Sequence, residues 1–106
     1  MGGKSSYSAT FLSTVAERWS ALAESLVTHA VRSELRRTDV VDKMGIEIRS
    51  PSKLALVEAW EHGNCLDVTI MNLATGHSTI LFAGACNGSD EIDLRLLALR
   101  DALRSN

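Results

Sequence analysis

Glu58 and Asp67 are the two carboxylates of this chain that could work together as an acid–base pair. Each lies in a β-prone run, at residues 54–61 and 65–71, and His62-Gly63 between the runs predicts a hairpin turn. In the register that this turn sets, Glu58 lies directly across from Asp67, and like charges in that position are unfavourable. Acid–base catalysis also requires a pocket that desolvates one carboxylate. A flat sheet face supplies no such pocket, so we expect no enzymatic activity.

The same register predicts a binding surface on the sheet face that carries the two acids. A large aromatic side chain beside an unpaired acidic couple favours a basic partner. Two alternatives stay open for the acids: they are solvated, or Arg49 of the preceding strand pairs with them. For the tryptophan the alternative is packing under a helix end or across a neighbouring strand. The expected partner-binding residues are Trp60, Glu58, Asp67, Thr69, Met71 and Glu47.

Imidazole and thiol side chains of the types that bind zinc are also present, at His62, Cys65, His77 and Cys86. The two histidines fall in turns at opposite ends of the predicted sheet, about 25 Å apart for a strand of this length. We therefore expect no metal site and no cofactor. The two cysteines lie near the same end of the predicted sheet, where a bridge is geometrically possible, and reduced thiols are the expected state.

Length and composition set the class of protein. A chain of 106 residues with 45% hydrophobic residues predicts one domain over 1–106, with residues 1–7 disordered. A formal net charge of −2 gives no electrostatic reason to bind nucleic acid. There is no secretion signal pattern and no apolar run long enough to cross a bilayer, so we expect a cytoplasmic protein that is a monomer or a weak dimer.

Helical periodicity runs from about residue 8 to residue 36. The main apolar stripe comprises Leu12, Val15, Trp19, Leu22 and Leu26, and Val27, Val31 and Leu35 continue it beside that stripe. A strand around 46–49 and a turn at Ser50-Pro51-Ser52-Lys53 follow. Pairing Arg49 with Leu54 then extends the same apolar face that the next hairpin predicts.

The end of the chain predicts one more strand and one more helix. The strand covers residues 78–86, with either Ile80 and Phe82 or Leu81 and Ala83 facing inward. The helix begins near Ser89 or Asp90 as its N-cap. Its apolar stripe comprises Ile92, Leu96, Leu99 and Leu103. The fold class is therefore α+β: a two-layer sandwich of helix, four-stranded antiparallel meander and helix, with both helices on one sheet face.

Residues 50–85 resemble the TriTu-type family of small bacterial immunity proteins. The family pattern is a Trp-Glu-x-Gly-x-Cys/Ala-x-Asp/Glu hairpin followed by a Thr-Gly turn, a last strand and an amphipathic helix. The matching residues here are Trp60, Glu61, Gly63, Cys65, Asp67, Thr75 and Gly76. The run from Ile46 to Ser50 sits where that family has its first strand.

The resemblance implies a role as an antidote encoded beside a secreted antibacterial toxin, often the last domain of a type VI or Rhs-type effector. The toxins that give the family its name are ADP-ribosyltransferases, and the antidote stays in the cytoplasm and occludes the active site of its cognate toxin. The alternative is a secretion chaperone or adaptor for an effector protein, which would expose a broader apolar groove and dimerise. The resemblance assigns no binding residue.

Overall fold

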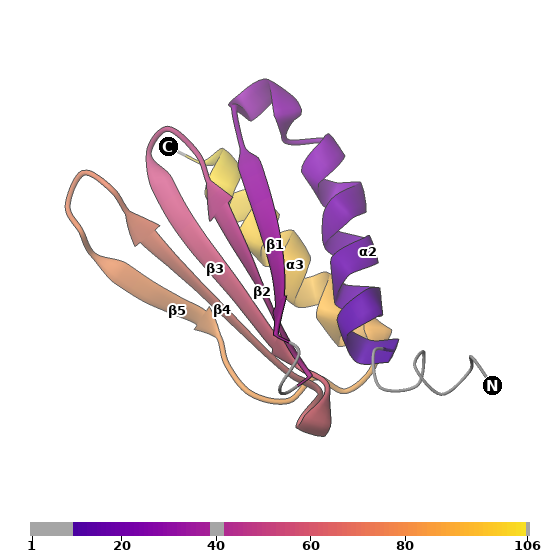
Figure 1. Ribbon diagram of the computed structural model, residues 1–106. Helices are drawn as coiled ribbons and strands as arrows, with labels where there is room; N and C mark the ends of the chain where they lie inside the picture. Colours follow the sequence, from indigo (N-terminus) through magenta and orange to yellow (C-terminus); the bar gives the residue numbers. More distant parts are fainter. Residues whose placement is uncertain (1–9, 39–41, 106) are drawn as a thin grey trace.

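Two helices and five strands follow one another in the computed structural model, which describes residues 10–38 and 42–105 (Figure 1). Residues 1–7, which we expected to be disordered, lie outside this part. The elements in chain order are α2 (Thr10–Glu24), the 3-10 turn η1 (Val27–His29), β1 (Arg32–Thr38), β2 (Lys43–Arg49), β3 (Lys53–Trp60), the 3-10 turn η2 (His62–Asn64), β4 (Cys65–Asn72), β5 (Ser78–Phe82) and α3 (Ser89–Arg104).

The described strands form one antiparallel sheet in the order β1-β2-β3-β4-β5, so each strand pairs with its neighbours in sequence. The register predicted for the central strands is confirmed. Ile46 pairs with Val57, and Glu58 pairs with Asp67. Side chains on a strand alternate between faces, so this register separates a buried face from an outer one. We call the face that no described helix covers the outer face.

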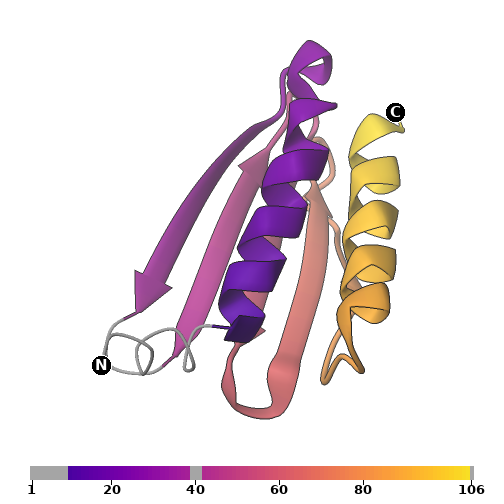
Figure 2. The ribbon, with the colours of Figure 1, turned by 90° about the vertical axis from the view of Figure 1, so that its right-hand side faces the viewer.

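Both helices lie on the same side of the sheet, as predicted (Figures 1 and 2). The buried core lies between the helices and the inner face of the sheet. Its residues include Leu12, Val15, Trp19, Leu26, Ile46, Ile48, Val57, Leu66, Val68, Ile92, Leu96, Leu99 and Leu103. The predicted stripe of the last helix is thus buried in full. The Trp19 indole, 3% exposed, donates a hydrogen bond from Nε1 to Ser33 Oγ at 2.9 Å.

The first helix ends earlier than predicted, and the meander has five strands where we expected four. α2 stops at Glu24, and residues 32–38 form the edge strand β1. Ala30 lies between them with a φ of 58°, a left-handed conformation that a helix cannot contain. Leu35 is therefore on the inner side of a strand, paired with Ile46, rather than on a helical stripe.

A β-bulge changes the face of the last strand. Ile80 pairs with Thr69 and Phe82 pairs with Val68, so Leu81 is the extra residue of the bulge. Ile80 consequently faces outward and is 69% exposed, whereas Phe82 packs against the core. Each of the two predicted registers, which assumed simple alternation, was half right: Phe82 and Leu81 both pack against the core, whereas Ile80 and Ala83 are exposed. The strand also ends at Phe82 instead of continuing to residue 86, and beyond it Cys65 and Ala85 form an isolated bridge.

Arg95 of α3 holds the segment that follows β5. Its Nη1 donates hydrogen bonds to the carbonyls of Leu66 and Gly84 at 2.8 and 2.9 Å, and its Nη2 donates to the carbonyl of Ala85 at 2.9 Å. The guanidinium also pairs with Glu91 at 3.0 Å. Arg95 is only 6% exposed. Glu91 and the three carbonyls supply the partners that a buried cation requires.

The N-terminus of α3 differs from the prediction in one detail. Its N-cap is Gly88, which has no side chain that could accept a capping hydrogen bond. Glu91 instead turns back, and its Oε1 accepts a hydrogen bond from the backbone amide of Asn87 at 2.6 Å. The acidic residues Asp90 and Glu91 do lie in the first turn, where the helix dipole favours them.

No helix in the described residues is long and apolar enough to cross a membrane.

Candidate protein-binding surface

The outer face carries all six side chains that the sequence predicted to bind a partner. The register aligns Glu47, Leu56 and Thr69 in one row across β2, β3 and β4. Glu58 and Asp67 form the next row. Trp60 lies beyond this second row and Met71 beyond the first, about 20 Å apart along the strand direction. The predicted residues therefore span the face rather than converge on one point.

Lys43 is the partner of the Trp60–Glu58 end of this face. Its ammonium lies 4.9 Å from the centroid of the Trp60 ring and 3.1 Å from Glu58 Oε2. β2 begins at Lys43, which pairs directly with Trp60, so the register itself produces this contact. We expected that Arg49 could serve the acids, but Arg49 pairs with Glu47 at 3.4 Å. Trp60 is half-buried, with one ring face covered by a cation.

Asp67 has a different partner, so the two acids are not an unpaired couple. Asp67 Oδ1 accepts a hydrogen bond from the backbone amide of Gly84 at 2.9 Å. Gly84 has a φ of +96°, which a residue with a side chain rarely adopts, and its carbonyl is one of those that Arg95 holds. The repulsion between Glu58 and Asp67 is thus offset by a separate partner for each carboxylate, Lys43 for Glu58 and the Gly84 amide for Asp67.

A shallow depression of about 480 Å³ opens beside these residues. It is lined by Trp60, His62, Cys65, Asp67, Ala83 and Gly84. A second hollow, of about 140 Å³, lies over Gly45, which contributes no side chain to the outer face. Glu47 and Leu56 are among the residues that border it. Both hollows could accept single side chains of a protein.

The glutamates of the outer face, Glu34, Glu47 and Glu58, each form an ion pair within the chain. Glu34 pairs with Arg36 at 3.3 Å, in addition to the Glu47–Arg49 and Glu58–Lys43 pairs. The expectation of an acidic face for a basic partner was therefore built on a wrong premise. What remains for a partner is apolar surface: Leu56 is 38% exposed and Ile80 is 69% exposed. Ile80 was missed because the bulge that turns it outward leaves no clear sequence signal.

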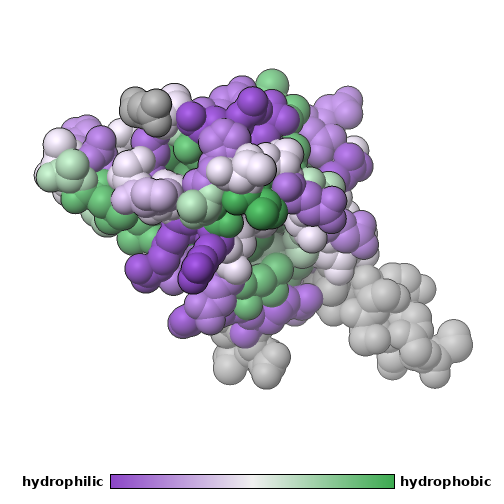
Figure 3. All heavy atoms as spheres, turned by 90° about the horizontal axis from the view of Figure 1, so that it is seen from above, coloured by the Kyte–Doolittle hydropathy of each residue, from purple (hydrophilic) through white to green (hydrophobic). Residues whose placement is uncertain are grey.

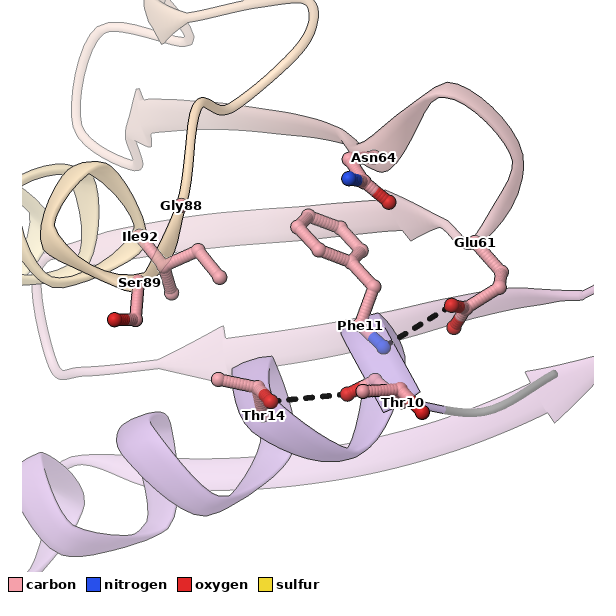
Figure 4. Close-up of a pocket in the computed structure, with 8 residues that line it drawn as sticks. All are labelled: Thr10, Phe11, Thr14, Glu61, Asn64, Gly88, Ser89 and Ile92. Atoms are coloured by element: carbon pink, nitrogen blue, oxygen red, sulfur yellow. Dashed lines mark hydrogen bonds between the residues drawn. The ribbon is translucent and has the colours of Figure 1, made fainter. Parts of the chain in front are cut away.

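The other cavity of note, of about 330 Å³, lies where the first turns of α2 and α3 meet the β3–β4 turn (Figure 4). Phe11 reaches into it between Asn64 and Ile92. Glu61 closes one side, because its carboxylate accepts hydrogen bonds from the backbone amides of Phe11 and Leu12 at 3.1 and 3.2 Å. These contacts cap a helix, so we assign this cavity to the fold rather than to binding.

The imidazole and thiol groups are divided between the two ends of β4. His62 lies in the β3–β4 turn and His77 in the β4–β5 turn, at opposite ends of β4, as the sequence predicted. Among the described residues no group of three or more side chains could hold a metal ion. Both cysteines are free, and burial raises the pKa of the Cys86 thiol.

Comparison of the chain with protein-family models, curated proteins and solved structures finds no match.

Proposed function

We propose that this protein is a non-catalytic binding module that attaches to a protein partner through the outer face of its sheet. The observation that carries the proposal is that the outer face exposes Leu56 and Ile80 in one row, with the half-buried Trp60 two rows further along the strands, while both described helices cover the other face. Exposed apolar strips rimmed by polar residues are typical of protein interfaces. Aromatic side chains at such places often carry much of the binding energy.

Within this class we propose an immunity protein that neutralises a cognate antibacterial toxin, such as an ADP-ribosyltransferase domain of a type VI or Rhs-type effector, by occluding its active site in the cytoplasm. The supporting feature is the hairpin motif from Trp60 to Asp67, three of whose matching side chains, Trp60, Cys65 and Asp67, line the depression at one end of the outer face. The motif residues therefore contribute to the surface that a partner would meet.

The experiment takes as candidate toxin the last domain of the protein encoded in the reading frame beside this chain. Growth of cells producing that domain is measured with and without this protein, and the dissociation constant is measured by calorimetry. We expect rescue of growth and tight binding. Because the glutamates of the outer face are ion-paired within the chain, binding should weaken little as salt rises. A neighbouring secretion-apparatus operon together with a dimeric chain would instead indicate the chaperone or adaptor alternative.

Two substitutions locate the contact. Leu56→Glu and Trp60→Ala should each cost about 2 kcal/mol of binding free energy or more, which is about 30-fold in Kd. Leu94→Glu is the matched control, since Leu94 is 58% exposed on α3. Unfolding curves of all three variants separate lost contact from lost fold. Full binding by both outer-face variants together with loss in Leu94→Glu would place the interface on the helices and contradict the proposal.

A further inference from the structure

The two edges of the sheet differ in how they are protected. β1 is one edge, and four of its seven residues are charged: Arg32, Glu34, Arg36 and Arg37. β5 is the other edge, and its five residues, Ser-Thr-Ile-Leu-Phe, carry no charge. Charged side chains on an edge strand discourage pairing with another strand, and their absence leaves the backbone groups of that edge available.

The β5 edge is also continuous with the apolar part of the outer face. The register aligns Leu56, Thr69 and Ile80 in one row that ends at this edge. Seen from above, hydrophobic side chains reach the surface at the end of the molecule where Figure 1 places the β4–β5 hairpin (Figure 3). On the inner side, a hollow of about 260 Å³ between the end of α3 and β5 is lined by residues that include Ile70 and Thr79. The helix layer therefore does not seal this edge.

We propose that the β5 edge receives an extended, uncharged segment of the protein partner, which adds a strand to the sheet. This inference rests on the proposed function and specifies how the partner binds. Backbone hydrogen bonds to β5 would provide affinity, and a side chain of the added strand would lie beside Ile80. An uncharged segment fits because β5 offers no countercharge, whereas a charged one would lose solvation.

A second copy of this chain fits the edge less well than a partner does. Two copies joined edge to edge would pair through only five residues each. So short a contact buries far less surface than the roughly 1,200–2,000 Å² of a stable interface. Such a pair would also continue the sheet in its own plane, so both outer faces would stay open. A different protein can cover the Leu56–Ile80 row and pair with β5 at the same time.

Amide hydrogen exchange of the unaltered chain tests the inference. The probe is the same neighbouring toxin domain, added until its free concentration is about 100 times Kd. Edge amides of β5 that exchange freely in the free chain should then slow by about 100-fold, since they exchange only when the complex dissociates. The amides of β1 should not change.

Other outcomes overturn the inference in distinguishable ways. Tight binding without new protection in β5 refutes strand addition but leaves the proposed function intact. Protection of β5 that rises with the concentration of this chain alone identifies a second copy as the occupant. Absence of any binding to the toxin domain refutes the proposed function and this inference together.

A pair of variants provides the second measurement. Ile80→Lys places a charge on the unprotected edge and should weaken binding at least tenfold. Val27→Lys is the control, because Val27 in η1 is 69% exposed, as Ile80 is. Equal affinities for the two variants would contradict the inference, provided that both keep the unfolding midpoint of the original chain. If Ile80→Lys does not fold, the exchange experiment on the unaltered chain decides.

Discussion

The carboxylate of Glu61 accepts a hydrogen bond from the backbone amide of Phe11, fifty residues earlier in the chain. The other oxygen of the same carboxylate accepts one from the amide of Leu12. A turn of the sheet thus supplies the capping group of a helix, and it places a negative charge at the positive end of that helix. This contact fixes the position of α2 relative to the β3–β4 turn.

Replacing this cap should weaken the whole fold. We expect Glu61→Ala to lower the free energy of unfolding by about 1–2 kcal/mol, the usual cost of losing a helix cap. Urea denaturation measures the change, and Glu17→Ala, at an exposed position of α2, is the control. Equal stability of the two variants would show that the Glu61 contact contributes nothing beyond a surface charge.

Arg95 should be more critical, because three carbonyls depend on it. Arg95→Met keeps much of the apolar volume but leaves the carbonyls of Leu66 and Ala85 without this donor, while the carbonyl of Gly84 keeps the Leu66 amide and Glu91 keeps the Asn87 amide. A buried carbonyl left without a donor costs about 1–3 kcal/mol, so we expect a loss of about 2–5 kcal/mol in the free energy of unfolding. Arg95→Lys should restore little of it, since an ammonium cannot reproduce the planar fork of a guanidinium. Arg104→Met, exposed in the last turn of α3, should change stability only slightly.

Acid should destabilise the fold partly through Glu91. Hydrogen bonds from the Asn87 amide and then from Arg95 lower the pKa of Glu91 from its ordinary value of 4.5. A carboxyl whose pKa is lowered on folding stabilises the fold above its unfolded pKa, and that stability is lost as the pH falls through the folded pKa. The stability difference between the original chain and Glu91→Gln should therefore shrink as the pH falls below 4.5. Parallel stability curves over this range would contradict the prediction.

The two thiols should differ in reactivity. Cys86 is 3% exposed, and burial raises its pKa, so it stays protonated and inaccessible at neutral pH. Cys65 is partly exposed in the depression beside Trp60. Mass spectrometry after alkylation should find one label on the folded chain and two in denaturant. Cys65→Ser should then take no label until it unfolds, and rapid labelling of that variant while folded would be the contrary result.

The middle of the fold was predictable because two independent turns agree on one face. The turn at residues 50–53 and the turn after Glu61 each set a register, and together they placed Ile46, Val57 and Val68 on the same side. Agreement between separate local signals is strong evidence for a sheet. The stripe of α3 was equally clear, since its four leucine and isoleucine positions follow the helical repeat without interruption.

β1 was missed because its sequence satisfies two periodicities at once. Val31 and Leu35 are four residues apart, as on a helix, yet Arg32, Glu34 and Arg36 also alternate, as on a strand. An edge strand buries little, so it needs few apolar residues to identify it. The break between the elements falls at Ala30, and neither glycine nor proline marks it.

The binding surface was predictable in its position but not in its electrostatics. All six predicted residues lie on the outer face, because facing depends only on the register. The partners of the acids depend on contacts outside the predicted strand pairs. Lys43 comes from a position before the predicted start of its strand, and the Gly84 amide comes from beyond the bulge.

The charged residues of β1 have a consequence for how far this protein can assemble. A filament of strands grows only if each unit has two open edges, one to join and one to be joined. Here the arginines and the glutamate of β1 obstruct one of those edges, so association along the sheet stops after a single step. A second copy that paired through β5 would end the extended sheet with its own charged β1, so we expect the chain not to form fibres at high concentration.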